Sequence, residues 1–451
     1  MISAPPIYLL IEETGRELRS RLLLCLHAAR IGYRSVIAPQ WLVWEILGDI
    51  PKGLLLFKGN SAVQAKNMAN AKAVGHLVAS IEEEALGLCD KAQINRCYAP
   101  SVADSCDLFF FQGPFQRDSV TAFLGALRRS CVSGNPRIDL LTPSFNTKVR
   151  VESKAIKRQF GDFLLINSNF STVNPRELDA CGVLETCLSA GWYDPNIPAD
   201  IEIFFTEAER ELADLRHLIR LIHTLLDRGF RHPIMIRPHP AENASIWEQA
   251  FADYENVRIQ RQDNLVAWIS AAKLLLHTSC TTGMEAFVLG KPAISLMSPE
   301  IEWTNIITSN LVNPTFKCLQ DAVLEIESAF RGEFLSAFNS PAHVMELSRH
   351  VKIEPDFTSS AQIANGCVKL LIDEGRYFEK TANFGAFERA STTDRSIDLS
   401  ALKIDAVRGA LRELGSALGF EQLPRVEKIA PGVILCHPLG DNRVDTTARV
   451  S

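Results

Sequence analysis

Several common signals are missing from this chain, and each absence narrows its class. None of the 11 cysteines forms a CxxC pair or a metal-binding spacing, so we expect a reduced, cytoplasmic compartment and no bound metal. No stretch approaches 18 consecutive apolar residues, so no membrane-spanning helix is expected. The apolar run Ile7–Ile11 is short and charged residues follow it at once, a pattern unlike that of an export signal.

The signatures of several enzyme classes are also absent. There is no G-x-G-x-x-G after the first apolar run and no G-x-x-x-x-G-K-[ST] anywhere, which argues against dinucleotide and P-loop sites. No G-x-S-x-G elbow occurs, so the serine-hydrolase signature is missing. The formal net charge is −6, so we expect no nucleic-acid partner and at most peripheral contact with a membrane. Any negatively charged ligand must therefore be bound by a local group of residues.

What the chain does contain is typical of a large soluble α/β protein. Its 451 residues, 47% apolar and 22% charged, suffice for two or three domains with sizeable cores. In the first third, short apolar runs alternate with helical spacing, and each run has the length of a buried strand. These runs are residues 7–11, 35–38, 53–57, 76–80, 107–111 and 131–133. The alternation predicts a parallel α/β sheet.

A second α/β unit is predicted from about residue 163. Its strand-like runs are residues 163–167, 233–236, 257–259, 274–276 and 293–296. Thr206 and Glu209 have the spacing of a capping box, which predicts a long helix from Thr206 to the stop at Gly229. The charged segment 150–158 is the predicted linker. We therefore expect domains at 1–150 and 151–375.

The remaining part, 376–451, is predicted to be a partly helical extension. Residues 399–418 have the spacing of an amphipathic helix, as do residues 360–374 just before the extension. The segment 377–396 has few aliphatic residues and is expected to form a loop or a loosely attached tail.

The first candidate site is the turn Arg237-Pro238-His239-Pro240, which directly follows a predicted strand. Open α/β sheets bind ligands beyond the carboxyl ends of their strands. The prolines restrict the backbone around the turn, so a guanidinium and an imidazole would be held at the sheet edge, where both can bind phosphate. The alternative is a rigid surface turn with an exposed histidine.

The second candidate is the segment 277–286, which also follows a strand. Ser279, Thr281, Thr282 and Gly283 open a helix, and hydroxyl groups with backbone N–H groups at such a place can bind an anion. Glu285 lies about one turn further on, where it could accept hydrogen bonds from ribose hydroxyls. The alternative is simple helix capping by Ser279 or Thr281.

Three further polar segments follow strands of the first unit. Asn135, Arg137 and Asp139 lie in a sharp turn after residues 131–133 and could face a cleft or hold an internal ion pair. The carboxylates of Glu82, Glu83 and Glu84 could supply a base or a nucleophile, or simply begin a solvated helix. The same choice applies to the first strand's end, where Glu12, Glu13, Arg16 and Glu17 follow. Two α/β units with a phosphate-type site suggest a nucleotide-sugar enzyme.

The sequence resembles bacterial surface carbohydrate (surface polysaccharide) biosynthesis proteins, which are glycosyltransferases of GT-B type. Its second half is similar to capsule and lipopolysaccharide Kdo transferases that use CMP-sugars. The matching stretches are IYLLIEETGRELRSRLLL, GHLVASIEEEALG, DLFFFQGPFQ, SGNPRIDLL, GDFLLINSNF, RPHPAEN and HTSCTTGMEAFVLGKPAISL, in order through residues 7–300. The family stretch Asp-Glu-Glu-Gly is Glu82-Glu83-Glu84-Ala85 here.

The resemblance implies two Rossmann-like domains facing across a cleft and a CMP-linked ulosonic acid such as CMP-Kdo as donor substrate, with no metal or other cofactor. It implies that His239 contacts the nucleotide and that Ser279, Thr281 and Thr282 hold its phosphate. Glu83 is the first choice for the catalytic acid, followed by Glu82, Glu13 and Asp139. Arg16, Asn135 and Arg137 are the expected substrate-binding residues.

We therefore expect a transferase that moves Kdo or a related sugar to a glycan acceptor, which we expect to be lipid-linked. The alternatives are a CDP-polyol phosphotransferase, a nucleotide-sugar epimerase, or a non-catalytic assembly protein.

Overall fold

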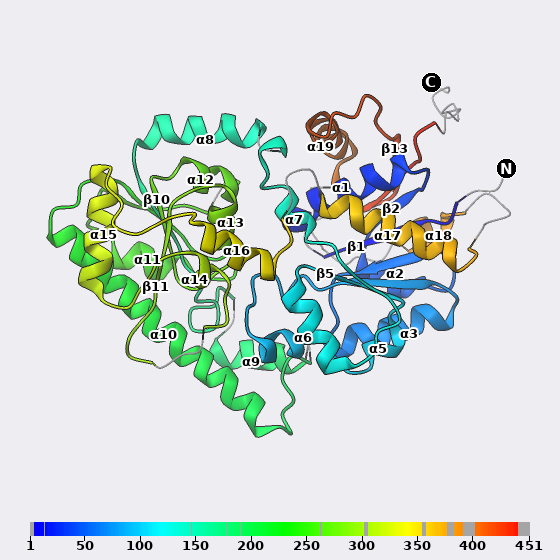
Figure 1. Ribbon diagram of the computed structural model, residues 1–451, viewed down its shortest axis with the longest axis horizontal. Helices are drawn as coiled ribbons and strands as arrows, with labels where there is room; N and C mark the ends of the chain where they lie inside the picture. The colour runs from blue at the N-terminus through cyan, green and yellow to red at the C-terminus, as the bar shows by residue number, and fades with distance from the viewer. Residues whose placement is uncertain are drawn as a thin grey trace.

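The computed structural model has two α/β lobes, each built around its own sheet (Figure 1). It describes residues 4–12, 14–145, 147–177, 179–189, 191–261, 264–301, 305–353, 358–376, 383–390 and 402–440. In that part of the chain, no helix combines the length and the apolar character needed to cross a bilayer.

The sheet of the first lobe has eight strands within the described residues, in the order β13-β14-β2-β1-β3-β4-β5-β6. Its strands are β1 (Ile7–Ile11), β2 (Ser35–Pro39), β3 (Leu54–Phe57), β4 (Leu77–Ile81), β5 (Leu108–Phe111), β6 (Ser130–Val132), β13 (Val426–Ala430) and β14 (Val433–Cys436). Strands β1 to β6 pair in parallel, and the hairpin β13–β14 joins β2 in antiparallel direction. Strands β1, β3, β4 and β5 are buried along their whole length, which explains their continuous apolar sequence.

Helices cover both faces of this sheet and bury two apolar layers. Before the chain enters the second lobe, the helices of the first lobe are α1 (Thr14–Arg30), α2 (Gln40–Glu45), α3 (Ala62–Ala73), α4 (Lys91–Arg96), α5 (Val102–Ser105), α6 (Pro114–Leu124), α7 (Pro136–Asp139) and the 3-10 turn Pro143–Phe145. One layer lies under α1 and the other lies under α2 and α3.

In the part of the second lobe that the structure describes, the sheet has six parallel strands in the order β12-β11-β10-β7-β8-β9. Its strands are β7 (Leu164–Asn167), β8 (Ile234–Arg237), β9 (Val257–Ile259), β10 (Leu274–His277), β11 (Ala293–Leu296) and β12 (Thr315–Phe316). Its helices are α8 (Thr147–Phe160), α9 (Ala180–Ser189), α10 (Pro198–Asp227), α11 (Ser245–Ala250), α12 (Leu265–Ala271), α13 (Thr282–Val288), α14 (Ser309–Val312) and α15 (Leu319–Arg331). The expected strands of both units are confirmed.

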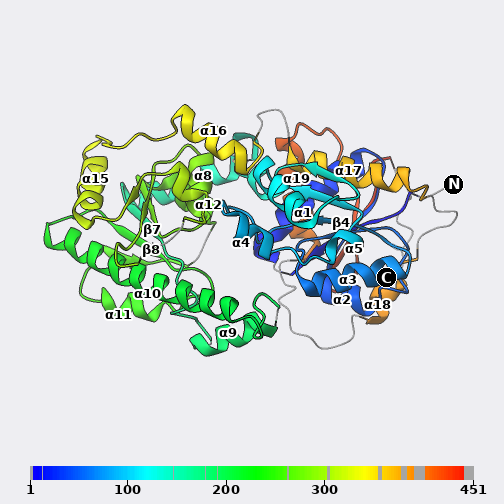
Figure 2. The same cartoon turned by 60° about the horizontal axis from the view of Figure 1, so that its bottom comes forward.

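The end of the described chain returns to the first lobe. Helix α16 (Pro341–His350) contacts α14 of the second lobe and α6 of the first, and Figure 2 shows it between the lobes. Helix α17 (Ser359–Asp373) then packs on α1. The last helices are α18 (Gly385–Ala390) and α19 (Ile404–Ala417), and they lie beside the hairpin strand β13. Residues 359–373 were expected in the second unit, but their apolar face is buried against the first.

The two lobes meet at a short stretch of backbone. The N–H of Cys89 donates to the carbonyl of Ile306 at 2.8 Å, and the N–H of Thr308 donates to the carbonyl of Gly87 at 2.7 Å. Gly87 has φ of +85°, and a Cβ there would lie 3.0 Å from Cγ2 of Thr281, so glycine permits this close approach. The contact brings the loop after β4 against the segment that opens α13.

Three local predictions are wrong. The linker predicted at 150–158 lies inside α8, whose Val149 and Ile156 are buried. The long helix starts at Pro198, so Thr206 is internal and its hydroxyl donates to the carbonyl of Glu202 at 2.9 Å instead of capping the helix. In the segment 377–396, α18 is helical and Phe387 is fully buried, while residues 377–382 and 391–396 lie outside the described residues.

Candidate functional site

Two cavities lie where the carboxyl ends of the parallel strands face the space between the lobes. The first, here called the Arg237 cavity, has a volume of about 520 Å³. It is lined by Glu83, Glu84, Leu86, Leu88, Arg137, Asn167, Ser168, Asn169, Arg176, Arg237, Pro238, His239, Pro240, Arg261, Leu265, Ser279, Cys280, Thr281, Thr282 and Ile307. The structure thus brings the 237–240 turn, the 279–282 segment, Arg137 and Glu83 together around one cavity.

The turn after β8 is held rigid by Glu242, which is fully buried. Its carboxylate accepts hydrogen bonds from the hydroxyl of Ser168 and from the backbone N–H groups of Phe170 and His239, all within 3.0 Å. Burial raises the pKa of this carboxyl group. The imidazole Nδ1 of His239 accepts from the N–H of Ala241 at 3.3 Å, which fixes the ring orientation. The turn is therefore an organised part of the cavity wall.

The guanidinium groups of Arg137, Arg176, Arg237 and Arg261 give the Arg237 cavity a strongly cationic wall. Arg237 lies over the ring of Trp268, with 5.7 Å from its Cζ to the ring centroid. Arg261 donates to the backbone carbonyl of Glu242. Guanidinium groups bind phosphate and carboxylate groups in a forked geometry. The cavity is thus suited to a ligand with two anionic groups.

The segment before α13 has an unusual backbone. Ser279 has φ of +51°, a left-handed conformation that costs energy for a residue with a side chain, and its Oγ accepts from Nδ2 of Asn310 at 3.0 Å. Thr281 occupies the N-cap position of α13 without a side-chain capping bond, so simple capping by Thr281 is wrong. Gly283 lies against His277, where a Cβ would meet the ring at 2.2 Å. Glu285 forms an ion pair with Arg137 across the lobes at 3.7 Å.

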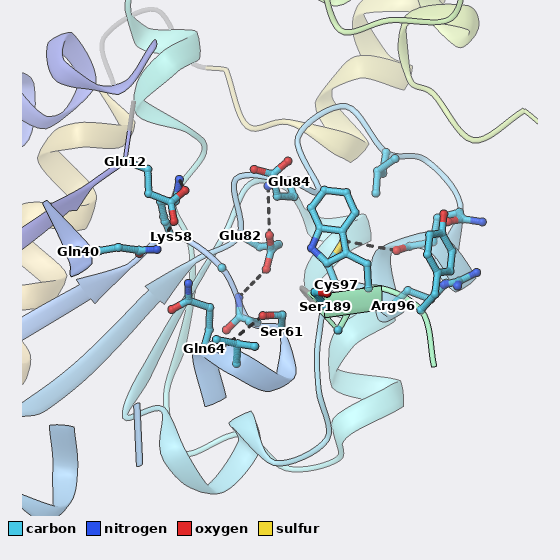
Figure 3. Close-up of a pocket in the computed structure, with 18 residues that line it drawn as sticks. Glu12, Gln40, Lys58, Ser61, Gln64, Glu82, Glu84, Arg96, Cys97 and Ser189 are labelled. Carbon is cyan, nitrogen blue, oxygen red and sulfur yellow. Dashed lines mark hydrogen bonds and ion pairs between the residues drawn. The ribbon is translucent and has the colours of Figure 1, made fainter. Parts of the chain in front are cut away.

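The second cavity, here called the Glu82 cavity, has a volume of about 530 Å³. Figure 3 shows side chains that line it. It is lined by Glu12, Gln40, Lys58, Gly59, Asn60, Ser61, Val63, Gln64, Glu82, Glu84, Leu88, Gln93, Arg96, Cys97, Ser189, Gly191, Trp192 and Tyr193. Glu84 and Leu88 belong to the walls of both cavities. Its wall combines polar side chains of the first lobe with the aromatic residues that follow α9.

Glu82 lies in the wall of this cavity and is 2% exposed. One carboxyl oxygen accepts from Nδ2 of Asn60 at 3.0 Å, and the other accepts from the backbone N–H of Glu84 at 3.1 Å. The hydroxyl of Ser80 donates to Oδ1 of Asn60 at 2.7 Å and so orients that amide. Burial raises the pKa of Glu82 to about 8. A carboxyl group with this pKa can accept a proton near neutral pH.

Glu83 points elsewhere. Its carboxylate forms an ion pair at 2.8 Å with Arg21, a residue of α1 with no exposed side-chain surface. Arg21 also donates to the carbonyl of Leu10 at 3.1 Å. A buried ion pair keeps both groups charged, because either alone would be costly in the interior. This geometry gives Glu83 a structural task and makes Glu82 the better candidate base.

Asp139 also has a structural role, contrary to the catalytic role expected for it. Its two carboxylate oxygens accept four hydrogen bonds of 2.7–2.9 Å from the backbone N–H and hydroxyl groups of Ser359 and Ser360. Those residues begin α17, so Asp139 binds the start of that helix. Asn135 is fully buried and caps α7 through the N–H of Arg137 at 2.8 Å, and it does not line either cavity.

The end of the first strand contributes a charged network to the Glu82 cavity. Lys58 lies 2.7 Å from Oε1 of Glu17 and forms a second ion pair with Glu12. The ion pairs raise the pKa of Lys58 against the opposing effect of burial. Glu13, one of the expected catalytic acids, and the side chain of Arg16 lie outside the described residues.

Several cavity residues were missed at the sequence level. Asn60 follows β3 and Asn167 is the last residue of β7, so the rule that led to Arg237 could have found both. The rule does not apply to Arg96, Trp192 and Tyr193, because they lie on a helix or in a loop and not at the end of a strand. Arg96 lies over the ring of Tyr193 at 5.0 Å and pairs with Asp200 at 3.2 Å. Within the described ranges, no three His, Cys, Asp or Glu side chains are grouped closely enough to hold a metal ion.

Comparison with known proteins identifies the fold. No protein-family model matches the chain. No curated protein sequence matches it significantly. Solved structures do match: a putative UDP-N-acetylglucosamine 2-epimerase from Listeria monocytogenes is 11% identical, with a TM-score of 0.52 over 82% of this chain and 98% of that one.

Two related structures match similarly. The UDP-GlcNAc 2-epimerase from Neisseria meningitidis bound to UDP-GlcNAc is 12% identical, with a TM-score of 0.50 over 82% of this chain and 100% of that one. The Methanocaldococcus jannaschii UDP-GlcNAc 2-epimerase in complex with UDP-GlcNAc and UDP is 11% identical, with a TM-score of 0.50 over 82% and 99%. The chain has the GT-B fold, as expected from the sequence. At this identity the likeness establishes the fold alone.

Proposed function

We propose that the chain is a glycosyltransferase of surface polysaccharide synthesis that takes a nucleotide-sugar donor in the Arg237 cavity and a glycan acceptor in the Glu82 cavity. The observation that carries this proposal is the pair of cavities, about 520 and 530 Å³, that meet at Glu84 and Leu88. A transferase must hold two substrates side by side, whereas an epimerase acts on one. The second cavity therefore favours transfer.

The donor is proposed to bring two anionic groups to the arginines of the Arg237 cavity. A CMP-linked ulosonic acid such as CMP-Kdo offers a phosphate and a carboxylate, and the sequence resemblance favours this donor. A UDP-sugar offers a diphosphate, and the matching structures from Neisseria meningitidis and Methanocaldococcus jannaschii hold UDP-GlcNAc. Both donors present the charge that the cationic wall fits, so nucleotide titration decides between them.

Glu82 is proposed as the general base. The acceptor hydroxyl oxygen attacks the anomeric carbon, and the bond from that carbon to the phosphate oxygen breaks, with its electron pair leaving on the nucleotide. The hydroxyl proton passes to the Glu82 carboxylate. Arg237 and its neighbours stabilise the charge that develops on the leaving phosphate. A single displacement of this kind inverts the anomeric configuration.

The first experiment is a thermal-shift panel of CMP, CMP-Kdo, UDP and UDP-GlcNAc. A ligand at about 100 times its Kd stabilises the fold by roughly 2.7 kcal/mol. Arg237→Met should abolish the shift, whereas Arg216→Met should not, because Arg216 lies on α10 outside both cavities, about half exposed. Absence of any shift in the wild type would favour a non-catalytic assembly protein.

The second experiment separates transfer from epimerisation. The stabilising nucleotide sugar is incubated with and without a glycan acceptor, and the products are followed by NMR. Transfer predicts that free nucleotide appears together with an extended glycan. An epimerised sugar nucleotide without acceptor would support the epimerase alternative.

A further inference from the structure

Three adjacent strands of the second lobe end in a row of polar residues. The register places Asn167 of β7 opposite His277 of β10 on one side and opposite Arg237 of β8 on the other. Asn167 is therefore the central residue of this row. Its side chain borders the Arg237 cavity but is only 4% exposed.

The side-chain amide of Asn167 has unsatisfied hydrogen-bonding capacity at both ends. Among the described residues, neither Oδ1 nor Nδ2 has a hydrogen-bond partner. Burying an amide without partners is destabilising. Such a group in a cavity wall is expected to serve a ligand.

The next residue, Ser168, does not relieve this cost, since its hydroxyl and N–H groups are already engaged. The Ser168 hydroxyl donates to the carboxylate of Glu242 at 2.9 Å. The Ser168 N–H donates to the carbonyl of Arg237 at 3.3 Å. The next residue is thus satisfied within the fold, whereas the amide of Asn167 stays without a partner in the wall of the Arg237 cavity.

We propose that Asn167 binds a sugar hydroxyl of the donor. This inference rests on the proposed function and names a residue that fixes the carbohydrate rather than the phosphate. The amide oxygen of Asn167 needs a donor, and phosphate oxygens at neutral pH only accept. A hydroxyl both donates to the amide oxygen and accepts from the amide nitrogen of this kind of side chain. The ribose and the transferred sugar both carry such hydroxyls.

The test replaces Asn167 with leucine, which has a similar size and no polar atom. Without ligand, the melting temperature of Asn167→Leu should equal or exceed that of the wild type, because a buried unpaired amide has been removed. With ligand, affinity measured by calorimetry should fall about tenfold or more, because a hydrogen bond to the sugar is lost. If Asn167 had only a structural role, the leucine variant would have a lower melting temperature and an unchanged ligand affinity.

Asn256 provides the matched control. Its Nδ2 donates to the carbonyls of Phe230 and His232 at 3.1 and 3.3 Å, so its amide is satisfied within the fold. Asn256→Leu should lower the melting temperature and leave ligand affinity unchanged. Should Asn167→Leu fail to fold, Asn167→Ala, which removes the same amide and adds no bulk, is titrated in its place.

The ligand arms identify the hydroxyl. UDP and CMP carry only ribose, whereas UDP-GlcNAc and CMP-Kdo carry the transferred sugar as well. If the variant binds all four ligands less tightly than the wild type, the hydroxyl is one of the ribose hydroxyls. Loss for the nucleotide sugars only assigns the transferred sugar. Unchanged affinity of the variant for every ligand that the wild type binds overturns this inference alone. Failure of the wild type to bind any of the four overturns the proposed function with it.

Discussion

Replacing Glu82 with glutamine removes the proposed base while keeping its shape. The pKa of Glu82 is raised from the ordinary carboxyl value to about 8 by burial. A base with this pKa is about 1% ionised at pH 6 and about half ionised at pH 8, so kcat/KM should rise about 50-fold between these pH values. The glutamine variant should lose about 10²- to 10⁴-fold in kcat and lose this pH-dependent rise.

The assay is transfer to a glycan acceptor, followed as nucleotide release from pH 6 to 9. Donor affinity is titrated in parallel and should be unchanged in Glu82→Gln, because Glu82 lines the Glu82 cavity and not the Arg237 cavity. Asp118→Asn, at a 65% exposed carboxylate on α6, is the control and should behave as wild type. A Glu82→Gln enzyme with wild-type turnover, or one that retains the rise toward pH 8, would refute the reasoning.

The same pKa predicts an effect on stability. Because the folded-state pKa of Glu82 lies above its unfolded value of about 4.5, its contribution to stability is fully present below pH 4.5 and is lost as pH rises through about 8. The free energy of unfolding of the wild type should therefore fall relative to that of Glu82→Gln over this interval. Urea unfolding at pH 5 and pH 8.5 measures the difference, and equal curves for both proteins would contradict a raised pKa.

Three further variants test the other assignments. His239→Ala should weaken nucleotide binding about ten- to a hundredfold in calorimetry without loss of fold, because a hydrogen bond to a charged group is lost; unchanged affinity would remove His239 from the site. Asp139→Ala should lower the free energy of unfolding by about 1–2 kcal/mol or more, because the cap of α17 is lost, and the folded fraction should keep its kcat. A variant that is as stable as the wild type but has a lower kcat would indicate a catalytic role for Asp139. Glu83→Gln should lower the free energy of unfolding by about 3–5 kcal/mol in urea unfolding, because Arg21 is left buried and unpaired. The double variant Arg21→Met/Glu83→Leu should recover most of this loss. A double variant that loses the sum of the two single-variant effects would contradict the pairing.

The sheets and much of the cavity wall could be predicted from local sequence. Buried parallel strands have continuous apolar runs, and polar residues directly after them meet at one edge of the sheet. That rule placed Arg237, His239 and Thr281 correctly beside one cavity. It applies equally to Asn60 and Asn167, which a systematic use of the rule would have included.

Long-range packing could not be predicted in the same way. Strand β14 pairs with β2, which lies almost 400 residues earlier in the chain. The sequence of residues 433–436 does not indicate which strand it pairs with. The choice between Glu82 and Glu83 depends on where adjacent side chains point, and only the buried Arg21 on α1 decides it. The local sequence around Asp139 is typical of a site acid. Its hydrogen bonds from Ser359 and Ser360, which lie far along the chain, are visible only in the folded structure.

The most direct test of the central claim is an NMR product assay with wild-type protein and the nucleotide sugar that stabilises it, with and without a glycan acceptor. The account predicts that the nucleotide sugar stays intact without acceptor, and that with acceptor free nucleotide and an extended glycan appear in equal amounts. Conversion of the donor to its epimer in the absence of acceptor would contradict it.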